Sequence, residues 1–529
     1  MCKKLFSNST SERMWNQLKW AIRLTVICCL PIMVFGQKKK DRDTSNLIFQ
    51  PHRIEFEATR NNDFTIINGE EDGLGVIIES FKKVEKQYEW TFVKLDSNLE
   101  EEWQQSFNVN LSSRLLGYEY SRGKYYVLAS ASQYRTEELL VFEIEDQKIR
   151  KFEITTVFPI SLEYFEVIGE TILLGGSVNL KPVIITYNLK EKKPKVLPGF
   201  YENRNIIMDI IIDDDELMFT VVMRERLITK QYTTRAKTFT SDGLLVQDIL
   251  VAPGDRRNLI DASSTNFDNG IQLMAGAHSK KSTSYSKGLY LAKFVNGRQQ
   301  FIRYHQYGDL QNFFGYLNSK REQRIKKRIE KRKSLGKKNK FNYRLVVHDI
   351  MEREDGINIL VGEAYYPRYS NSTTYANPYF NTGNGAGFLG YKYTHAIVVA
   401  FDANGEILWD HSFKIRDVLT YSLDKFIAIN MVEDDILLMY LEENEIRTKV
   451  VARSEVVEGQ TFTPVKLNDQ QEEVRSRDPE IEGLEPWVEG SFYAYGIHSV
   501  SKSQSPVFGG SRKVFYINKI EYNQNRIVN

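Results

Sequence analysis

Cysteine is almost missing from this chain of 529 residues, which contains only Cys2, Cys28 and Cys29. This absence excludes disulfide frameworks, thiolate zinc sites, iron–sulfur clusters and cysteine nucleophiles from the rest of the chain. Core packing must therefore stabilise the fold. With 42% hydrophobic and 12% aromatic residues, the chain has enough apolar side chains for a large core.

An excess of one charge and long apolar runs are also lacking. The chain has 71 Lys and Arg against 69 Asp and Glu, a net charge of +2, which argues against a protein coated in positive charge for nucleic acid. No run of 18 apolar residues occurs, so the sequence predicts no bundle of transmembrane helices.

The first 36 residues have the secretory pattern of a basic region, the apolar run 24–35 and a small residue, Gly36, before Gln37. We expect residues 1–36 to be a signal peptide. The alternative is an anchor helix, but twelve residues rise only about 18 Å, short of a hydrocarbon core of about 30 Å. A mature chain without cysteine fits a secreted protein in the periplasm or on the surface of a Gram-negative bacterium.

Short runs rich in Ile, Val, Leu, Tyr and Phe recur along the chain, as at 125–131, 206–212 and 271–277. Turns containing Asp, Asn and Gly separate them, which predicts an all-β fold. The runs form groups of about 40 to 45 residues, the size of one four-stranded propeller blade. The groups lie near residues 64–109, 115–155, 162–199, 205–250, 261–306, 345–415, 425–466 and 487–527.

This period predicts a seven- or eight-bladed β-propeller over residues 64–527, with two β-sandwiches as the competing arrangement. Residues 37–63 form an N-terminal segment, part of which we expect to close the ring against the C-terminal strand. Two insertions break the period.

The first insertion, residues 318–340, is strongly basic, and its composition predicts a helix over 318–335. Its net charge is +10; the whole chain carries +2 and residues 1–36 carry +4, which leaves −12 for the rest. We expect an arm that contacts an anionic polymer, the alternative being a solvated helix or linker. The candidate contacts are Arg324, Lys326, Lys327, Arg328, Lys331 and Arg332.

The second insertion, residues 365–393, is rich in tyrosine, and its prolines and glycines predict a loop. Tyrosine combines apolar area with a polar tip, which suits contact with a sugar or a peptide. Packing of these rings on the propeller is the alternative. The candidate ligand-binding residues are Tyr365, Tyr366, Tyr369, Tyr375 and Tyr379.

Motifs for catalysis, metal binding and cofactor binding are missing, so no catalytic residue, metal ligand or cofactor is assigned. No two of the seven histidines have the spacing of a helical zinc site. We expect the neighbours His348 and Asp349 to have structural roles, because adjacent strand residues point to opposite faces. Carboxylates such as those of residues 213–215 fall in predicted outer turns. Acid–base catalysis would need two carboxylates in one cleft.

Residues 393–413 combine a strand, the turn Asp402-Ala-Asn-Gly405 and a strand containing Trp409. This segment resembles a blade of the quinoprotein-like or Kelch-like propellers. Together with residues 362–369, it resembles uncharacterised exported β-propeller proteins of Bacteroidota. The resemblance implies a propeller fold and export, and it transfers no catalytic residue.

These features favour a non-enzymatic binding or scaffold protein of the cell envelope. Its propeller would present the two insertions to a glycan, a peptide or an envelope protein. The alternative is a propeller enzyme, a glycoside hydrolase or lyase, with carboxylates or tyrosines lining the central funnel. The oligomeric state stays open.

Overall fold

A computed structural model describes residues 43–132, 136–337, 339, 341–369, 388–469, 471–475, 481–502 and 511–524. The chain divides into two compact units, residues 1–43 and 44–529. The expected signal peptide lies outside the described residues. Within the described part of the chain, no helix is both long and apolar enough to cross a membrane.

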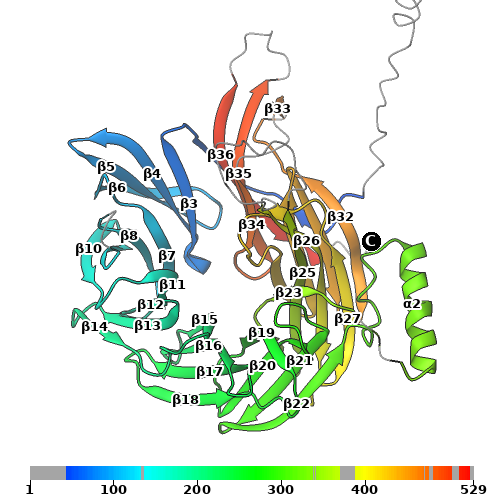
Figure 1. Ribbon diagram of the computed structural model, residues 1–529. Coiled ribbons are helices and arrows are strands. Elements are labelled where there is room, and N and C mark those ends of the chain that lie inside the picture. Colours follow the sequence, from blue (N-terminus) through cyan, green and yellow to red (C-terminus); the bar gives the residue numbers. More distant parts are fainter. Residues whose placement is uncertain are drawn as a thin grey trace, which may run out of the picture. The chain divides into compact units, whose positions relative to one another are not determined.

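The second unit is an eight-bladed β-propeller, which confirms the predicted fold class. Its antiparallel sheets follow one another around a ring in chain order (Figure 1). Blade 1 consists of β3 (Asn62–Asn68), β4 (Leu74–Val84), β5 (Gln87–Leu95) and β6 (Glu101–Asn110). Blade 2 consists of β7 (Leu115–Ser121), β8 (Lys124–Ser130), β9 (Glu138–Glu145) and β10 (Lys148–Thr155). Blade 3 consists of β11 (Ser161–Ile168), β12 (Thr171–Val178), β13 (Lys181–Asn188) and β14 (Lys193–Val196). Blade 4 consists of β15 (Ile206–Asp213), β16 (Met218–Arg226), β17 (Tyr232–Thr240) and β18 (Leu245–Leu250).

In the part of the chain that the structure describes, blades 6 and 8 have six strands each, and the others have four. Blade 5 consists of β19 (Asn258–Ser264), β20 (Ile271–Ser279), β21 (Gly288–Val295) and β22 (Arg298–Gln306). Blade 6 consists of β23 (Arg344–Val347), β24 (Met351–Glu352), β25 (Asn358–Tyr369), β26 (Phe388–Phe401), β27 (Ile407–Lys414) and β28 (Leu419–Thr420). Blades 7 and 8 consist of β29 (Ala428–Val432), β30 (Asp435–Glu442), β31 (Glu445–Ala452), β32 (Glu455–Pro464), and β33 (Glu472–Val474), β34 (Glu482–Pro486), β35 (Ser491–Lys502), β36 (Arg512–Tyr522), β1 (Ile48–Phe49), β2 (Arg53–Glu57).

Among the described residues, the core consists of eight buried apolar clusters, one at each junction between neighbouring blades. The junction of blades 2 and 3, for example, joins Val141 of β9 to Leu174 of β12 and Ile185 of β13. Each blade is therefore apolar on both faces, as the continuous apolar runs of its middle strands require. Burial at these junctions, without any disulfide, holds the ring together.

The ring is closed by strands from both ends of the unit. β1 and β2 pair antiparallel with β36, so the outermost strands of blade 8 come from the N-terminal side of blade 1. At the junction of blades 8 and 1, Phe64 stacks on Phe515 with ring centroids 4.4 Å apart. Backbone pairing and aromatic packing thus join residues more than 400 positions apart in the sequence.

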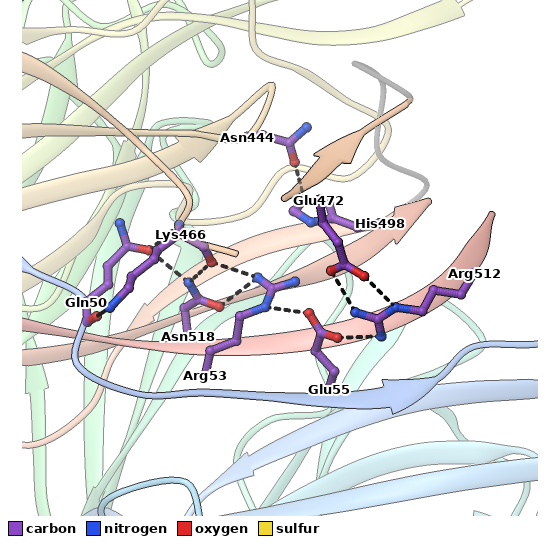
Figure 2. A network of polar contacts seen from close by, with 9 residues as sticks. All are labelled: Gln50, Arg53, Glu55, Asn444, Lys466, Glu472, His498, Arg512 and Asn518. Carbon is purple, nitrogen blue, oxygen red and sulfur yellow. Dashed lines mark hydrogen bonds and ion pairs between the residues drawn. The ribbon is translucent and has the colours of Figure 1, made fainter. Parts of the chain in front are cut away.

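A buried polar network reinforces this closure (Figure 2). Arg53 of β2 contacts the Glu55 carboxylate at 2.7 Å and donates to Asn518 Oδ1 of β36 at 2.9 Å. Arg512 of β36 joins Glu55, at 2.6 Å, to Glu472 of β33, at 2.8 Å. The side chains of Arg53 and Glu55 are only 4% and 7% exposed, so each charge needs the partner that this network supplies.

Helix α2 (Ser319–Ser334) lies in the connection between blades 5 and 6, at the outside of the ring in Figure 1. Asn318 caps it by accepting a hydrogen bond from the Arg321 backbone N–H at 3.0 Å. Ile329 is buried and Ile325 is partly buried against the apolar cluster of blades 5 and 6. The helix is therefore docked by one narrow apolar stripe.

The tyrosine-rich segment differs from the expected loop where it is described. Residues 365–369 continue β25 and residues 388–393 belong to β26, so both ends form an antiparallel hairpin that lengthens blade 6. Cross-strand aromatic pairs favour the extended conformation, as between Tyr369 and Phe388, whose centroids are 5.7 Å apart. Tyr375 and Tyr379 lie outside the described residues.

Candidate functional site

Four consecutive blades bend their innermost strands in the same way. A one-residue shift in register occurs in β7, β11, β15 and β19 as each pairs with the second strand of its blade. The residues that follow the shift are Gly117, Tyr164, Asp209 and Asp261. Bulges redirect side chains, and here two carboxylates occupy the redirected position. Each accepts a hydrogen bond from the next residue's N–H, at 3.0 and 3.1 Å.

These strands contact one another in sequence around the axis of the ring, and their carboxylates interact. Burial raises the pKa of Glu166 in β11 to about 9, with further contributions from Glu119 and Asp209. Burial also raises the pKa of Glu119 in β7 to about 7, aided by Asp214 and Glu70. We call Glu119, Glu166, Asp209, Asp214 and Asp349 the axial carboxylates.

Lys425 places a positive charge among them. Its Nζ lies 3.4 Å from Asp209 of blade 4 and 3.0 Å from Asp349 of blade 6, although Lys425 precedes blade 7. Burial favours a lower pKa for Lys425, but the two carboxylates outweigh it and raise the pKa. Burial alone would raise the pKa of Asp349, but the Lys425 ammonium acts against it and the pKa is lowered. This contact joins three blades near the axis.

The loop that carries Lys425 is held by a buried carboxylate. Glu363 Oε1 of β25 accepts hydrogen bonds from the backbone N–H groups of Phe426 and Ile427 at 2.8 and 2.9 Å. The same oxygen lies 2.6 Å from His348 Nε2. His348 thus points into blade 6 while its neighbour Asp349 points to the axis. The network fixes the position from which Lys425 reaches the axial carboxylates.

A polar pocket of about 480 Å³ opens where the innermost strands begin. Blades 4, 5 and 6 all contribute to this mouth pocket, and its volume is in the range of small-ligand sites. Its lining comprises Met208, Arg224, Tyr232, Ile260, Asp261, Ala277, Thr283, Ser284, Ser286, Arg344, Leu345, Val346, Tyr365 and Leu423. Tyr365 is the one described tyrosine candidate that reaches this pocket.

Two arginines dominate the charge of the mouth pocket. Arg224 Nη1 donates to the Ile260 carbonyl at 3.4 Å, and the guanidinium lies 5.1 Å from the Tyr232 ring centroid. Arg344 lies over the Tyr285 ring at 4.7 Å. The buried Nε atoms of both arginines have no hydrogen-bond partner among the described residues.

Asp261 forms the acidic part of the mouth pocket. Its carboxylate accepts hydrogen bonds from the backbone N–H groups of Val347 and Ala262, both at 3.1 Å. Burial raises the Asp261 pKa to about 6, against the influence of these N–H groups and of Arg224. Asp261 is therefore mostly ionised at neutral pH, and it braces blade 5 against blade 6.

The candidate anion-contact residues lie along α2. Four of them, Arg324, Lys327, Arg328 and Lys331, are exposed and follow the spacing i, i+3, i+4, i+7 on one face of the helix. Lys326 instead pairs with Glu322 at 2.7 Å, and Arg332 is half-buried. We call the four exposed bases the α2 basic stripe.

The remaining described tyrosine candidates do not gather around the mouth pocket. Tyr366 and Tyr369 are exposed on the hairpin of blade 6. Tyr365 packs against Tyr391, with centroids 5.6 Å apart, and burial raises its pKa to about 12.

Sequence reasoning did not single out the axial carboxylates of β7, β11 and β15 or the two pocket arginines. It placed residues 213–215 in a solvated outer turn, yet Asp214 accepts a hydrogen bond from Ser121 two blades away at 3.0 Å. The turn follows an innermost strand and therefore lies beside the axis. No local signal marks such residues, because their partners come from other blades. Among the described residues, no three His, Cys, Asp or Glu side chains converge as metal ligands.

The fold and the site define a β-propeller with an acidic axis and a basic mouth pocket. The chain matches no family model, and no curated protein sequence matches it. It is similar to the β-propeller domain of the Trilobed protease from Pyrococcus furiosus, with 8% identity, 74% of this chain and 96% of that chain covered, and a TM-score of 0.35.

It is also similar to a polysaccharide lyase, with 9% identity, coverage of 91% and 100%, and a TM-score of 0.34. A third similar structure is a prolyl endopeptidase, with 9% identity and a TM-score of 0.35 over 78% of this chain. The match spans 51%, or about half, of that endopeptidase. Likenesses this distant carry no argument about activity.

Proposed function

We propose that this chain is an exported, non-enzymatic binding protein of the cell envelope that holds an acidic polysaccharide. The observation that carries the proposal is the α2 basic stripe. Four exposed bases on one helical face form a linear row, and a polyanion offers charges along a line. The docked Ile329 fixes the opposite side of the helix, so the row is held in place rather than swinging free.

The charge distribution of the chain supports this assignment. Apart from the signal segment and the basic insertion, the chain carries a net charge of −12, so the net field of the propeller repels an anionic polymer and favours its approach at α2. The exposed Tyr366 and Tyr369 on the hairpin of blade 6 offer aromatic faces to sugar rings. A peptide or an envelope protein is the alternative partner for the same surfaces.

The test compares polymer binding by the full chain and by two triple variants. Arg324→Gln, Lys327→Gln and Lys331→Gln together remove three charges from the stripe while keeping good helix formers. Lys82→Gln, Lys83→Gln and Lys86→Gln remove three exposed lysines from the β4–β5 hairpin as a matched control. We expect polygalacturonate binding to weaken at least tenfold in the first variant only.

Neutral dextran and short DNA complete the panel, each at low and high salt. Binding to polygalacturonate should fall as salt rises, because exposed charges are screened. Dextran binding as tight as polygalacturonate binding would overturn the proposal. An equal loss of polygalacturonate binding in the two triple variants would overturn it as well. A preference for DNA would assign the stripe to nucleic acid instead.

A second candidate function is a glycoside hydrolase or lyase, and the axial carboxylates favour it. Glu166 has a raised pKa of about 9, so it keeps its proton at neutral pH, while Lys425 keeps Asp349 ionised. Acid–base catalysis on sugars uses one protonated and one ionised carboxyl group, and the innermost strands of this propeller carry both kinds. Turnover of a polysaccharide that is lost in both Glu166→Gln and Asp349→Asn would establish this function.

A further inference from the structure

We propose that the mouth pocket binds the carboxylate of a hexuronate residue, with Arg224 and Arg344 as its ligands. The inference deepens the proposed function and rests on it for the saccharide nature of the ligand. It concerns a different site from the α2 basic stripe, so each can be tested without the other.

Neither pocket arginine forms an ion pair with a carboxylate among the residues described. Arg224 and Arg344 line the same pocket. Guanidinium groups match carboxylates in a bidentate geometry, and the charge-assisted hydrogen bonds of such a pair are strong. A ligand carboxylate in the pocket would therefore supply the anionic partner that the chain does not.

Both guanidinium groups are held in place before a ligand arrives. Arg224 is fixed by the Ile260 carbonyl and by the Tyr232 ring, and Arg344 lies over Tyr285. Side chains that are already ordered lose little entropy when a ligand arrives. Arginine stacked on an aromatic ring keeps its edge donors available for an anion.

The rest of the pocket offers further polar residues. Thr283, Ser284 and Tyr365 line it, which suits a ligand that is polar all round, such as a sugar ring. Among the described residues that line the pocket, Asp261 is the only one with a carboxylate, and its oxygens already accept hydrogen bonds from two backbone N–H groups. The side chains of the pocket therefore carry a net positive charge, which favours an acidic sugar over a neutral one.

The experiment is calorimetric titration of the full chain with trigalacturonate and with galactotriose, its uncharged counterpart. We expect at least tenfold tighter binding of trigalacturonate. Arg224→Gln and Arg344→Gln should each weaken that binding at least tenfold and leave the weak galactotriose binding unchanged. Arg344→Lys keeps the charge but loses the bidentate geometry, so it should fall between the wild type and Arg344→Gln.

Melting curves establish that each variant folds, and Arg344→Lys provides a mild substitution if a glutamine variant does not. Equal affinity for the two trisaccharides, or unchanged trigalacturonate affinity in the arginine variants, would overturn the inference. A free tripeptide carboxylate that binds as tightly as trigalacturonate would overturn the saccharide assignment.

The variant of α2 separates this inference from the proposed function. Loss of polygalacturonate binding in the α2 triple variant with normal trigalacturonate binding supports both sites. If the α2 triple variant loses polygalacturonate binding but Arg224→Gln keeps its affinity for trigalacturonate, the proposed function stands and the mouth-pocket inference is overturned. If the α2 triple variant keeps polygalacturonate binding but Arg224→Gln loses affinity for trigalacturonate, the pocket stands and the role of α2 is overturned.

Discussion

Glu166 is the residue whose surroundings predict the clearest pH effect. Burial, Glu119 and Asp209 raise its pKa to about 9, so the folded chain holds a proton that the unfolded chain releases near pH 4.5. Because the folded state binds more protons across this window, stability falls as pH rises from about 5 to about 9. Glu166→Gln removes this loss, and we expect a gain on the order of 1 kcal/mol or more in the free energy of unfolding at pH 9.

Urea unfolding at pH 6, 7.5 and 9 measures this effect. Glu163→Gln is the matched control, because Glu163 lies on the same strand and is exposed. We expect the control to keep the pH dependence of the wild type. A Glu166→Gln profile as steep as that of the wild type would contradict the assigned burial of this charge.

Arg53 supports a second prediction at the residue scale. Its side chain is nearly buried and donates to the Lys466 carbonyl and to Asn518 while it contacts Glu55. Arg53→Met leaves these acceptors short of a donor, so we expect a loss of about 2–4 kcal/mol in the free energy of unfolding. Arg475→Met, at an exposed site, should cost far less. Equal losses in chemical unfolding would show that the closure network contributes little.

At the scale of elements, the closing strand differs from an ordinary blade edge. Phe56 of β2 and Phe152 of β10 both lie on the outermost strand of a blade and pack partly on an apolar cluster. The backbone N–H groups of Ala58, on the β2 side, and of Thr156, on the β10 side, donate to the neighbouring strand. Phe56 and Phe152 lie two and four residues before these donors, and N–H directions alternate along a strand, so their own N–H groups also point into the sheet. Proline at either position removes that donor.

We expect Phe56→Pro to lower the melting temperature more than Phe152→Pro does, because β2 takes part in ring closure and β10 does not. Melting curves of the two variants, followed by circular dichroism, give the comparison. A Phe152→Pro loss as large as that of Phe56→Pro would show that β2 is only an edge strand.

The elements also show which parts of the fold are visible in the sequence. Strand alternation and Asp-Gly or Asn-Gly turns are local signals, and their period of about 40 to 45 residues predicted the propeller correctly. The tyrosine-rich insertion was harder, because its prolines and glycines favour a loop while its cross-strand partners favour strands. Tyr365 and Tyr369 lie in a strand because each pairs with a residue of β26.

At the scale of the whole molecule, the candidate site arises from contacts between blades. Lys425 meets Asp209 across 216 positions of sequence. The mouth pocket likewise needs Arg224 from blade 4 and Arg344 from blade 6. Sequence reasoning could propose Tyr365 and the bases of α2 because insertions stand out from a repeat. It could not find residues whose roles depend on ring closure, since each looks like an ordinary strand residue.

The most direct test of the account asks whether the mouth pocket is where a short acidic saccharide binds. Ser284→Trp places a large side chain at the exposed rim of the pocket, and Glu354→Trp places one in the exposed turn before β25, at the other end of that strand from Tyr365. We predict that calorimetric titration with trigalacturonate gives wild-type affinity for Glu354→Trp and at least tenfold weaker binding for Ser284→Trp. Unchanged binding in Ser284→Trp would contradict the account.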